Sequence, residues 1–285
     1  MIVGISGSTG FVGQSIVNRM RGLEWTVREI NRAAFALNDD DFLAREIEGA
    51  DVVINLAGAP VSKKWSGTYK NEILASRIDT TRKITDAISR AVKKSAVFIS
   101  ASAIGIYDSI NSHTESSRAY SGSFLAEVCQ RWEQTAMEAD ASTRVVILRL
   151  GVVLGRNGGA LAKMHLPFSI GLGGKIGSGN QAMSFIHLTD LVDAVIFTIE
   201  NTSVKGIVNG VSPYPTTNAE FTEVLAKSLG QPAWFTVPEF ALKMAFGEAS
   251  VIMLEGQRVL PEKLLKEGFR FRYPTVQNAL VQIYG

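Results

Sequence analysis

The chain begins Met1-Ile-Val-Gly-Ile-Ser-Gly7-Ser-Thr-Gly10-Phe-Val-Gly13, and this stretch decides the fold. An apolar run leads into three glycines spaced three residues apart, and a helical pattern follows them. Glycines have no Cβ, so the backbone can turn tightly and a pyrophosphate can approach its N–H groups. The last glycine allows the helix to pack closely on the strand. This strand–turn–helix context predicts a dinucleotide-binding loop rather than an ordinary glycine-rich turn.

Apolar strands alternate with amphipathic helices through the first half of the chain. Strands are predicted at Ile2–Ser6, Thr26–Asn31, Asp51–Leu56, Val97–Ser102 and Arg144–Leu150. Helices are predicted at Val12–Met20, Asp39–Ile47, Gly67–Ala91 and Phe124–Ala139. Such alternation is typical of right-handed βαβ units and a parallel sheet covered on both faces. The predicted fold class is α/β, a doubly wound parallel (Rossmann) sheet with a smaller C-terminal α/β substrate lobe.

The second half has a different character. Gly151–Gly179 is rich in glycine, and a helix is predicted from about Thr189 to Glu200. A strand at Gly206–Val211 and a helix at Asn218–Leu229, capped by Thr217 or Asn218, follow. We expect residues 1–150 to form a nucleotide-binding domain and residues 151–285 to form mainly the substrate lobe. A return of residues 184–211 to the first domain stays open.

The composition of the chain argues against several classes of binding partner. The 285 residues are 46% hydrophobic with a net charge of +2 and no block of basic residues, which argues against a nucleic acid or a membrane as the main partner. Cys129 is the single cysteine, so an intramolecular disulfide is excluded. Three scattered histidines have no metal-ligand spacing, and no metal is expected. Because Met1 already begins the first strand, we expect no leader and a cytoplasmic protein.

The end of the second strand predicts the cofactor. In this fold an acid at that place binds the 2′-OH of NAD, whereas an arginine accommodates the 2′-phosphate of NADP. Asn31 and Arg32 occupy the place, and Glu29 stands two residues too early. A guanidinium can hold a phosphate with two parallel hydrogen bonds, so NADP is predicted over NAD. After the third strand, Leu56 and Ala57 allow the backbone to lie against the adenine and ribose.

Motifs along the whole chain resemble the extended short-chain dehydrogenase/reductases, the NAD(P)-dependent sugar-nucleotide epimerases and dehydratases. Within that superfamily the chain is similar to an atypical branch of unknown substrate with a characteristic C-terminal domain. The motifs are SGSTGFVG from Ser6, NLAGAPV from Asn55, EILASRIDTTRKI from Glu72, SASAIGIY from Ser100, RWEQTA from Arg131, RLGVVLGRNGGAL from Arg149, GLGGKIGSGNQAMSFIHLTDL from Gly171 and GQRVLPEKLLKEGF from Gly256.

The resemblance implies a set of NADP-binding residues. Around the cofactor it places Gly7, Ser8, Thr9, Gly10, Phe11, Val12, Asn31, Arg32, Leu56 and Ala57. Three further matched positions that line the site are Glu72, Arg77 and Val153. For Arg77 an alternative is an ion pair on its own helix with Glu72 or Asp79.

The resemblance also shows what is missing. The superfamily uses a tyrosine and, four residues later, a lysine that lowers the tyrosine pKa and holds the ribose. Phe124 and Val128 stand at these places, and neither can transfer a proton. The serine that polarises the substrate oxygen is present as Ser102. Tyr107 or Tyr120 is the candidate replacement acid, and packing over the cofactor is the alternative role of Tyr107.

The remaining notable residues are interpreted as having structural rather than catalytic roles. His187 is expected to be a hydrogen-bonding residue at the head of its helix, and Cys129 a small buried one. Trp132 and Glu133 are interpreted as packing and helix-surface positions. Met183-Ser184 replaces the Arg-Asp that precedes the Phe-Ile-His segment in sugar-nucleotide enzymes, which argues against a sugar-nucleotide substrate.

Two functions remain open. The first is an NADP-binding oxidoreductase or epimerase that acts on a small molecule without the usual Tyr–Lys pair. The alternative is a non-catalytic NADP-binding sensor or regulatory protein. Either would be a monomer or a homodimer.

Overall fold

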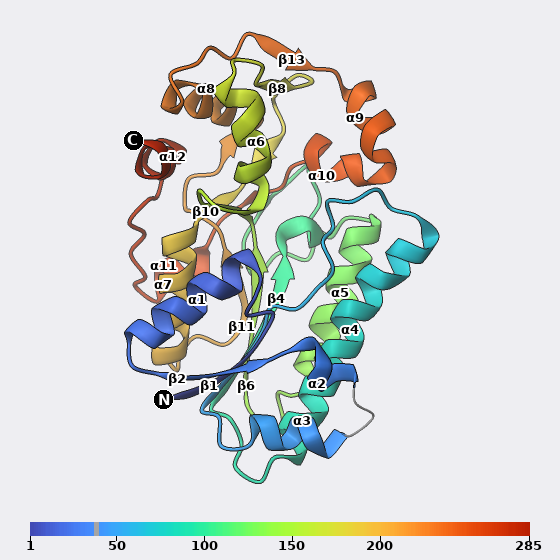
Figure 1. The fold of residues 1–285 in the computed structure, drawn as a ribbon, viewed down its shortest axis with the longest axis vertical. Helices are drawn as coiled ribbons and strands as arrows, with labels where there is room; N and C mark the ends of the chain where they lie inside the picture. Colours follow the sequence, from blue (N-terminus) through green and yellow to red (C-terminus); the bar gives the residue numbers. More distant parts are fainter. Residues whose placement is uncertain (37–39) are drawn as a thin grey trace.

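A parallel sheet of six strands forms the centre of the computed structural model, which describes residues 1–36 and 40–285 (Figure 1). The strand order is β11-β6-β4-β3-β1-β2, and every neighbouring pair is parallel. The strands are β1 (Ile2–Ser6), β2 (Thr26–Ile30), β3 (Val52–Asn55), β4 (Val97–Ala103), β6 (Arg144–Leu150) and β11 (Gly206–Gly210). The order reverses between β1 and β3, so a ligand crevice is expected there.

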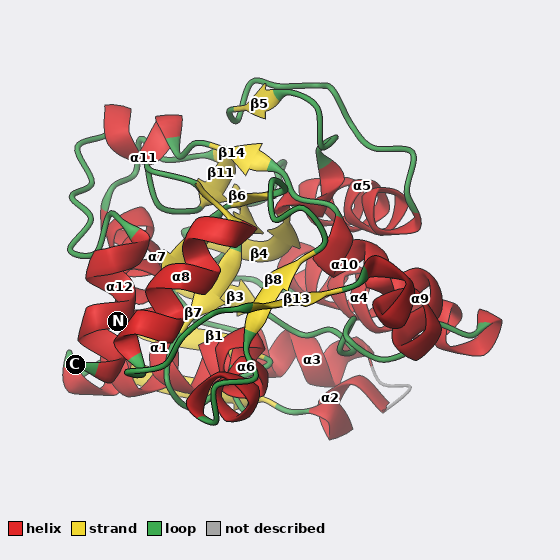
Figure 2. Cartoon of the chain, turned by 90° about the horizontal axis from the view of Figure 1, so that it is seen from above, coloured by secondary structure: helices red, strands yellow, loops and turns green. Residues whose placement is uncertain are grey.

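Helices cover both faces of the sheet (Figures 1 and 2). On one face, α1 (Phe11–Gly22) and α7 (Leu188–Glu200) pack on alternate residues of the central strands, including Val3 and Ile5. On the other face, α3 (Asp40–Ile47), α4 (Gly67–Arg90) and α5 (Phe124–Met137) pack on Val53, Phe98 and Val145. The doubly wound α/β prediction is therefore confirmed.

A third core holds the smaller lobe together. Leu161, Phe185, Phe221 and Leu280 are buried in it, and it joins α6 (Gly159–Ser169), α8 (Asn218–Ser228) and α12 (Val276–Tyr284). The remaining short elements are α2 (Arg32–Ala36), η1 (Ile104–Ile106), β5 (Ser112–His113), β7 (Val152–Leu154), β8 (Gly174–Ile176), β9 (Ala182–Met183), β10 (Phe185–His187), β12 (Thr216–Thr217), β13 (Phe235–Val237), α9 (Glu239–Phe246), η2 (Gly247–Ser250), α10 (Val251–Leu254), β14 (Arg258–Val259) and α11 (Glu262–Lys266).

Most of the expected elements begin and end within two residues of their predicted bounds. The helix expected from Asp39 is described from Asp40, because Asp39 lies outside the described residues. Thr217 rather than Asn218 caps α8, because its side chain accepts the Glu220 N–H at 3.2 Å. The glycine-rich segment Gly151–Gly179 contains β7, α6 and β8, which its composition did not predict. Within the ranges described, no helix combines the length and apolar character needed to cross a bilayer.

Candidate functional site

The glycine loop closes tightly between β1 and α1. Gly7 has a φ of +80°, and a Cβ there would lie 2.8 Å from the Leu56 carbonyl carbon, at the end of β3. A Cβ on Gly13 would lie 2.2 Å from the Gly7 oxygen. Larger residues at these two positions would therefore push the loop away from β3 and from its own helix.

The loop presents the start of α1 to the space beyond the sheet. Gly10 is the N-cap and contributes no side-chain cap, and the first turn carries no acidic residue. Arg19 and Arg21 lie in the last turn, where the helix dipole is negative. The N–H groups of the first turn and the dipole together favour an anion at this end of the helix.

A cleft of about 380 Å³ opens beside the loop, at the carboxyl ends of the central strands. Of the residues predicted for the site, the cleft is lined by Gly7, Gly10, Phe11, Val12, Leu56, Arg77 and Ser102. Leu125, Val128, Cys129, Trp132 and Leu150 add a mainly apolar wall. The structure thus brings the glycine loop, the end of β3 and Ser102 on β4 around one space.

Other predicted residues lie outside the lining described for this cleft. Asn31 and Arg32 are exposed at the end of β2, where the Asn31 side chain accepts the Ala34 N–H at 3.2 Å and α2 begins. Glu72 is exposed on α4, and Val153 is half-buried on β7. The remaining predicted residues outside the lining are Ser8, Thr9, Ala57 and Tyr107.

Arg77 reaches from α4 across the cleft wall. Its guanidinium donates to the carbonyls of Ile73 and Ala59, both at 3.1 Å, and lies 5.2 Å from the centre of the Trp132 ring. Burial lowers the pKa of Arg77. The ion pairs described for residues 1–36 and 40–285 include none from Arg77, so the alternative of a pair with Glu72 or Asp79 is not the arrangement found. A half-buried cation faces the cleft.

Ser102 is joined to a buried ion pair. Its hydroxyl donates to Glu133 Oε1 at 2.6 Å, and Arg149 donates to Glu133 through Nε at 2.8 Å and Nη2 at 2.6 Å. Arg149 is fully buried and Glu133 is 9% exposed. The interpretation of Glu133 as a helix-surface position was therefore wrong. Its place on the apolar stripe with Cys129 and Ala136 was the signal that could have revealed it.

Tyr107 belongs to the same network and not to the cleft. The side chain is fully buried, and its hydroxyl accepts from Arg149 Nη1 at 2.7 Å. The Thr114 carbonyl and Asn209 Oδ1 each lie 3.1 Å from that hydroxyl. Burial raises the pKa of Tyr107, so the phenol stays protonated. This geometry differs from both expectations, a proton donor in the cleft and a residue packed over the cofactor.

Phe124, at the place of the family tyrosine, packs in an apolar cluster with Trp65, Phe246 and Ala249. Its ring lies 5.4 Å from that of Trp65, and Lys70 Nζ lies 5.1 Å from its centre. The cluster holds the segment α9–η2–α10 against α4 and α5.

His187 and Cys129 have the structural roles that were predicted. His187 caps α7, with Nδ1 accepting the Thr189 N–H at 3.1 Å and Nε2 lying 2.8 Å from Gln282 Oε1. Cys129 is buried, and burial raises the pKa of its thiol to about 11. Within the described ranges, no group of three His, Cys, Asp or Glu residues is placed to hold a metal ion.

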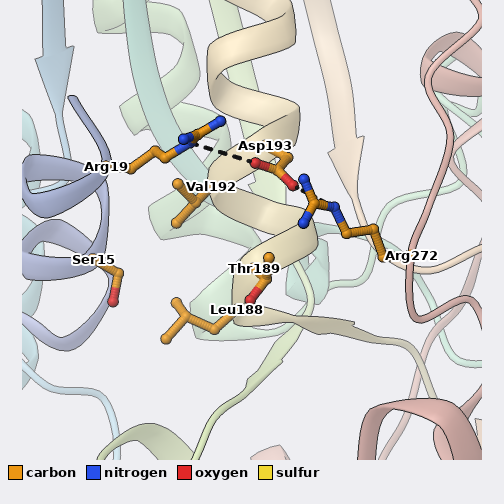
Figure 3. A pocket seen from close by; sticks show the side chains of 7 residues that line it. All are labelled: Ser15, Arg19, Leu188, Thr189, Val192, Asp193 and Arg272. Carbon is orange, nitrogen blue, oxygen red and sulfur yellow. Dashed lines mark ion pairs between the residues drawn. The ribbon is translucent and has the colours of Figure 1, made fainter. Parts of the chain in front are cut away.

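A second pocket, of about 340 Å³, lies between α1 and α7 (Figure 3). Asp193 lies between two arginines there, with its carboxylate 3.8 Å from Arg19 Nε and 3.1 Å from Arg272 Nε (Figure 3). Both guanidiniums are largely exposed and share one carboxylate. These ion pairs connect the C-terminal segment to the two helices at the surface. We interpret the pocket as part of that connection, and as separate from the glycine-loop site.

Comparison with known proteins places this geometry in a family. A model described as the NAD dependent epimerase/dehydratase family matches residues 3–209, and one described as a domain of unknown function (DUF1731) matches residues 237–283. The epimerase family protein SDR39U1 homolog, chloroplastic, of Arabidopsis thaliana is 40% identical over 297 residues, covering 98% of this chain and 86% of that protein. The epimerase family protein SDR39U1 of Mus musculus is 35% identical over 291 residues, covering 99% of each chain.

Comparison with solved structures agrees with this family assignment. The human epimerase family protein SDR39U1 (isoform2) with NADPH superposes with a TM-score of 0.93 at 32% identity, covering 100% of this chain and 99% of that one. The nucleoside-diphosphate sugar epimerase from Corynebacterium glutamicum superposes with a TM-score of 0.82 at 29% identity, covering 100% of this chain and 58% of that one. The family resemblance predicted from the motifs is confirmed. The chain belongs to the NAD dependent epimerase/dehydratase family, among the epimerase family proteins that carry the DUF1731 domain.

Proposed function

We propose that this chain binds NADP in the cleft beside the glycine loop. The observation that carries the proposal is the loop itself: Gly7 and Gly13 leave no space for a Cβ, and the uncapped first turn of α1 faces the cleft. The NADPH present in the human relative's structure supports the choice of cofactor.

The pyrophosphate would lie at the first turn of α1. We assign its contacts to Gly7, Ser8, Thr9, Gly10, Phe11 and Val12. The adenosine end would lie over Leu56 and Ala57, with Asn31 and Arg32 at the 2′-phosphate. The nicotinamide end would extend toward Ser102 and Val153. Glu72, which is exposed on α4, would lie at the edge of the site.

Arg77 would supply positive charge beside the ribose. In the family this charge comes from a lysine four residues after the tyrosine, and Val128 stands there in this chain. Val128 and Arg77 both line the cleft, and the Arg77 guanidinium lies 5.2 Å from the centre of the Trp132 ring. The arginine on α4 therefore compensates for the lysine that α5 lacks.

The reaction we propose is an NADP-dependent oxidoreductase or epimerase step on a small molecule in the cytoplasm, by a monomer or a homodimer. When bound, the nicotinamide supplies hydride chemistry, and Ser102 contacts the substrate oxygen. The second candidate is an NADP-responsive sensor. It is favoured by the absence of a phenol from the cleft lining described, since Tyr107 is buried elsewhere and Phe124 packs against Trp65.

Calorimetric titration with NADPH and NADH tests the cofactor. We expect NADPH to bind at least about tenfold more tightly, because a charge-assisted hydrogen bond contributes about 1.5–3 kcal/mol. Equal or tighter binding of NADH would contradict NADP specificity, and binding of neither would overturn the proposal. Arg77→Met should weaken NADPH binding. Arg131→Met is the matched control, because Arg131 is exposed on α5 in a pair with Glu127.

A further inference from the structure

Glu133 is not part of the cleft lining described, but its hydrogen-bond partner Ser102 is. Its carboxylate is covered by α5 and the sheet, and the Ser102 hydroxyl, itself 2% exposed, stands between it and the cleft. The only charged side chain in the lining described is the Arg77 guanidinium. The Cys129 thiol in the same lining already carries its proton, because burial raises its pKa to about 11. The buried carboxylate one hydrogen bond behind the cleft wall is therefore the candidate proton acceptor.

The direction of the Ser102–Glu133 bond follows from the ion pair. Arg149 donates to both carboxylate oxygens of Glu133, and a carboxylate in such a bidentate pair is ionised. An ionised carboxylate only accepts hydrogen bonds, so Ser102 must donate its one proton to Oε1. The Ser102 oxygen is then left with lone pairs alone. Toward the cleft, Ser102 is an acceptor.

This direction is opposite to the one expected from the family. A serine that polarises a carbonyl oxygen must donate a proton to it, and the Ser102 proton is already committed at 2.6 Å. Val128, Leu125 and Leu150 in the neighbouring wall are apolar. The Arg77 guanidinium in the same lining already donates to the carbonyls of Ile73 and Ala59, and the Cys129 thiol is hydrogen-bonded to Ser102 itself. A ligand atom beside Ser102 that could only accept would face another acceptor in a partly desolvated place, which weakens its binding.

We propose that the substrate position beside Ser102 selects a hydroxyl group, and that Glu133 is the positioning residue that imposes this selection and receives the proton. The inference rests on the proposed function and names the class of substrate, an alcohol. Chemically, the substrate O–H bond breaks as a new O–H bond forms on Ser102. The original Ser102 O–H bond breaks as one forms on Glu133 Oε1. Two protons each move by one hydrogen bond, so the net transfer is one proton from the substrate to Glu133. The substrate oxygen keeps the electron pair of its broken O–H bond, and no oxidation or reduction occurs in this step.

The selection of a hydroxyl group can be tested with small probe molecules that cannot undergo the reaction. On protein saturated with oxidised NADP, tert-butanol has no hydrogen on its carbinol carbon and acetone is already oxidised, so neither exchanges hydride. Ligand-observed NMR gives their dissociation constants. We expect wild type to prefer tert-butanol on the order of tenfold, which corresponds to one unmatched polar contact.

Single-residue variants distinguish the roles of Ser102 and Glu133 in this preference. Ser102→Ala removes the acceptor and should abolish the preference. Glu133→Ala removes the acceptor of the Ser102 proton and frees that proton for the cleft, so acetone should gain affinity. In Glu133→Gln an amide oxygen at the place of Oε1 still accepts from Ser102 and from Arg149 Nε, so the preference should persist. A purely structural role for Glu133 would produce no such gain. Tyr107→Phe is the matched control: it removes a hydrogen bond to the same Arg149 and should leave the preference unchanged.

Equal affinities in wild type, a preference for acetone, or an unchanged preference in Ser102→Ala would overturn the inference. If Glu133→Ala does not fold, wild type and Ser102→Ala still decide, because Ser102→Ala leaves the ion pair intact. Failure of NADP to bind would instead overturn the proposed function. Normal NADP binding without a preference for tert-butanol would overturn only the hydroxyl selection.

Discussion

Glu133 and Arg149 show how far single residues could be interpreted from the sequence. Each is a charge within an apolar pattern, so burial of both could have been predicted. Their partners could not, because Ser102 lies 31 positions from Glu133, and Arg149 lies 16 positions away on another strand. The network exists only where α5 crosses the ends of β4 and β6. The missing Tyr–Lys pair was visible in the sequence, whereas this buried network beside it was not.

Arg32 is the residue on which NADP specificity depends most directly. It is exposed at the start of α2, and no ion pair is described for it within residues 1–36 and 40–285. Arg32→Ala should weaken NADPH binding about 10- to 100-fold and leave NADH nearly unchanged, because only NADPH carries the 2′-phosphate. Calorimetry with both cofactors measures this, with Arg131→Ala as control. An unchanged NADPH affinity would remove Arg32 from the site.

Among the elements, α5 explains why the family chemistry cannot simply be restored. Phe124 and Val128 lie one turn apart on it, yet only Val128 is part of the cleft lining described. Phe124 packs against Trp65 instead, in the cluster that holds α9–η2–α10. The sequence predicted the helix and the substitutions, but the rotation of α5 is decided by packing between elements.

The double variant Phe124→Tyr/Val128→Lys should therefore be unstable and inactive. The new lysine would be buried beside Arg77, and an uncompensated buried charge costs about 3–5 kcal/mol. Urea denaturation and NADPH consumption over a panel of small aldehydes and ketones measure both effects. Phe124→Tyr alone should stay within about 1 kcal/mol of wild type, and Val128→Met controls for size. Turnover by the double variant would show that the tyrosine reaches the cleft.

Strands β1, β3, β4 and β6 were predictable because each contains a short apolar run next to a helical pattern along the chain. The segment β7–α6–β8 was not. Helix α6 begins at Gly159 without a side-chain cap and contains Pro167, so it lacks the usual start signal and includes a residue that normally interrupts helices. Its stability comes from Leu161 and Phe168, which are buried in the third core. Tertiary packing overrides the local pattern there.

The molecule as a whole is held together by buried polar side chains that connect distant parts of the chain. Asp190 on α7 accepts the N–H groups of Arg272 and Tyr273 at 2.8 and 2.9 Å. Ser184 accepts the Val259 N–H at 2.9 Å, and Glu115 accepts the Lys263 N–H at 3.2 Å. These bonds join the DUF1731 region to the part of the chain that forms the sheet. The bonded residues are separated by 75 to 148 positions in the chain, which puts such contacts beyond sequence patterns.

His187 makes one of these connections sensitive to pH. In its neutral form Nδ1 accepts from Thr189 and Nε2–H donates to Gln282 on α12. Burial lowers its pKa, although Gln282 and Asp190 act in the opposite direction. As the pH falls through about 6.5, the ordinary pKa of histidine, the unfolded chain therefore takes up a proton that the folded chain resists. The stabilising effect of His187 is complete above that pH and is lost below it.

His187→Gln tests this coupling between the two parts of the chain. At about pH 8, urea denaturation should show wild type more stable by about 1–2 kcal/mol, since one buried hydrogen-bonded connection is disturbed. At about pH 5.5 the difference should shrink, because only wild type then carries the cost of a neutral buried imidazole. His165→Gln, at an exposed histidine on α6, should show no such trend. A difference that stays constant or widens in acid would mean that His187 is protonated in the folded protein, and that α7 and α12 are joined by an imidazolium.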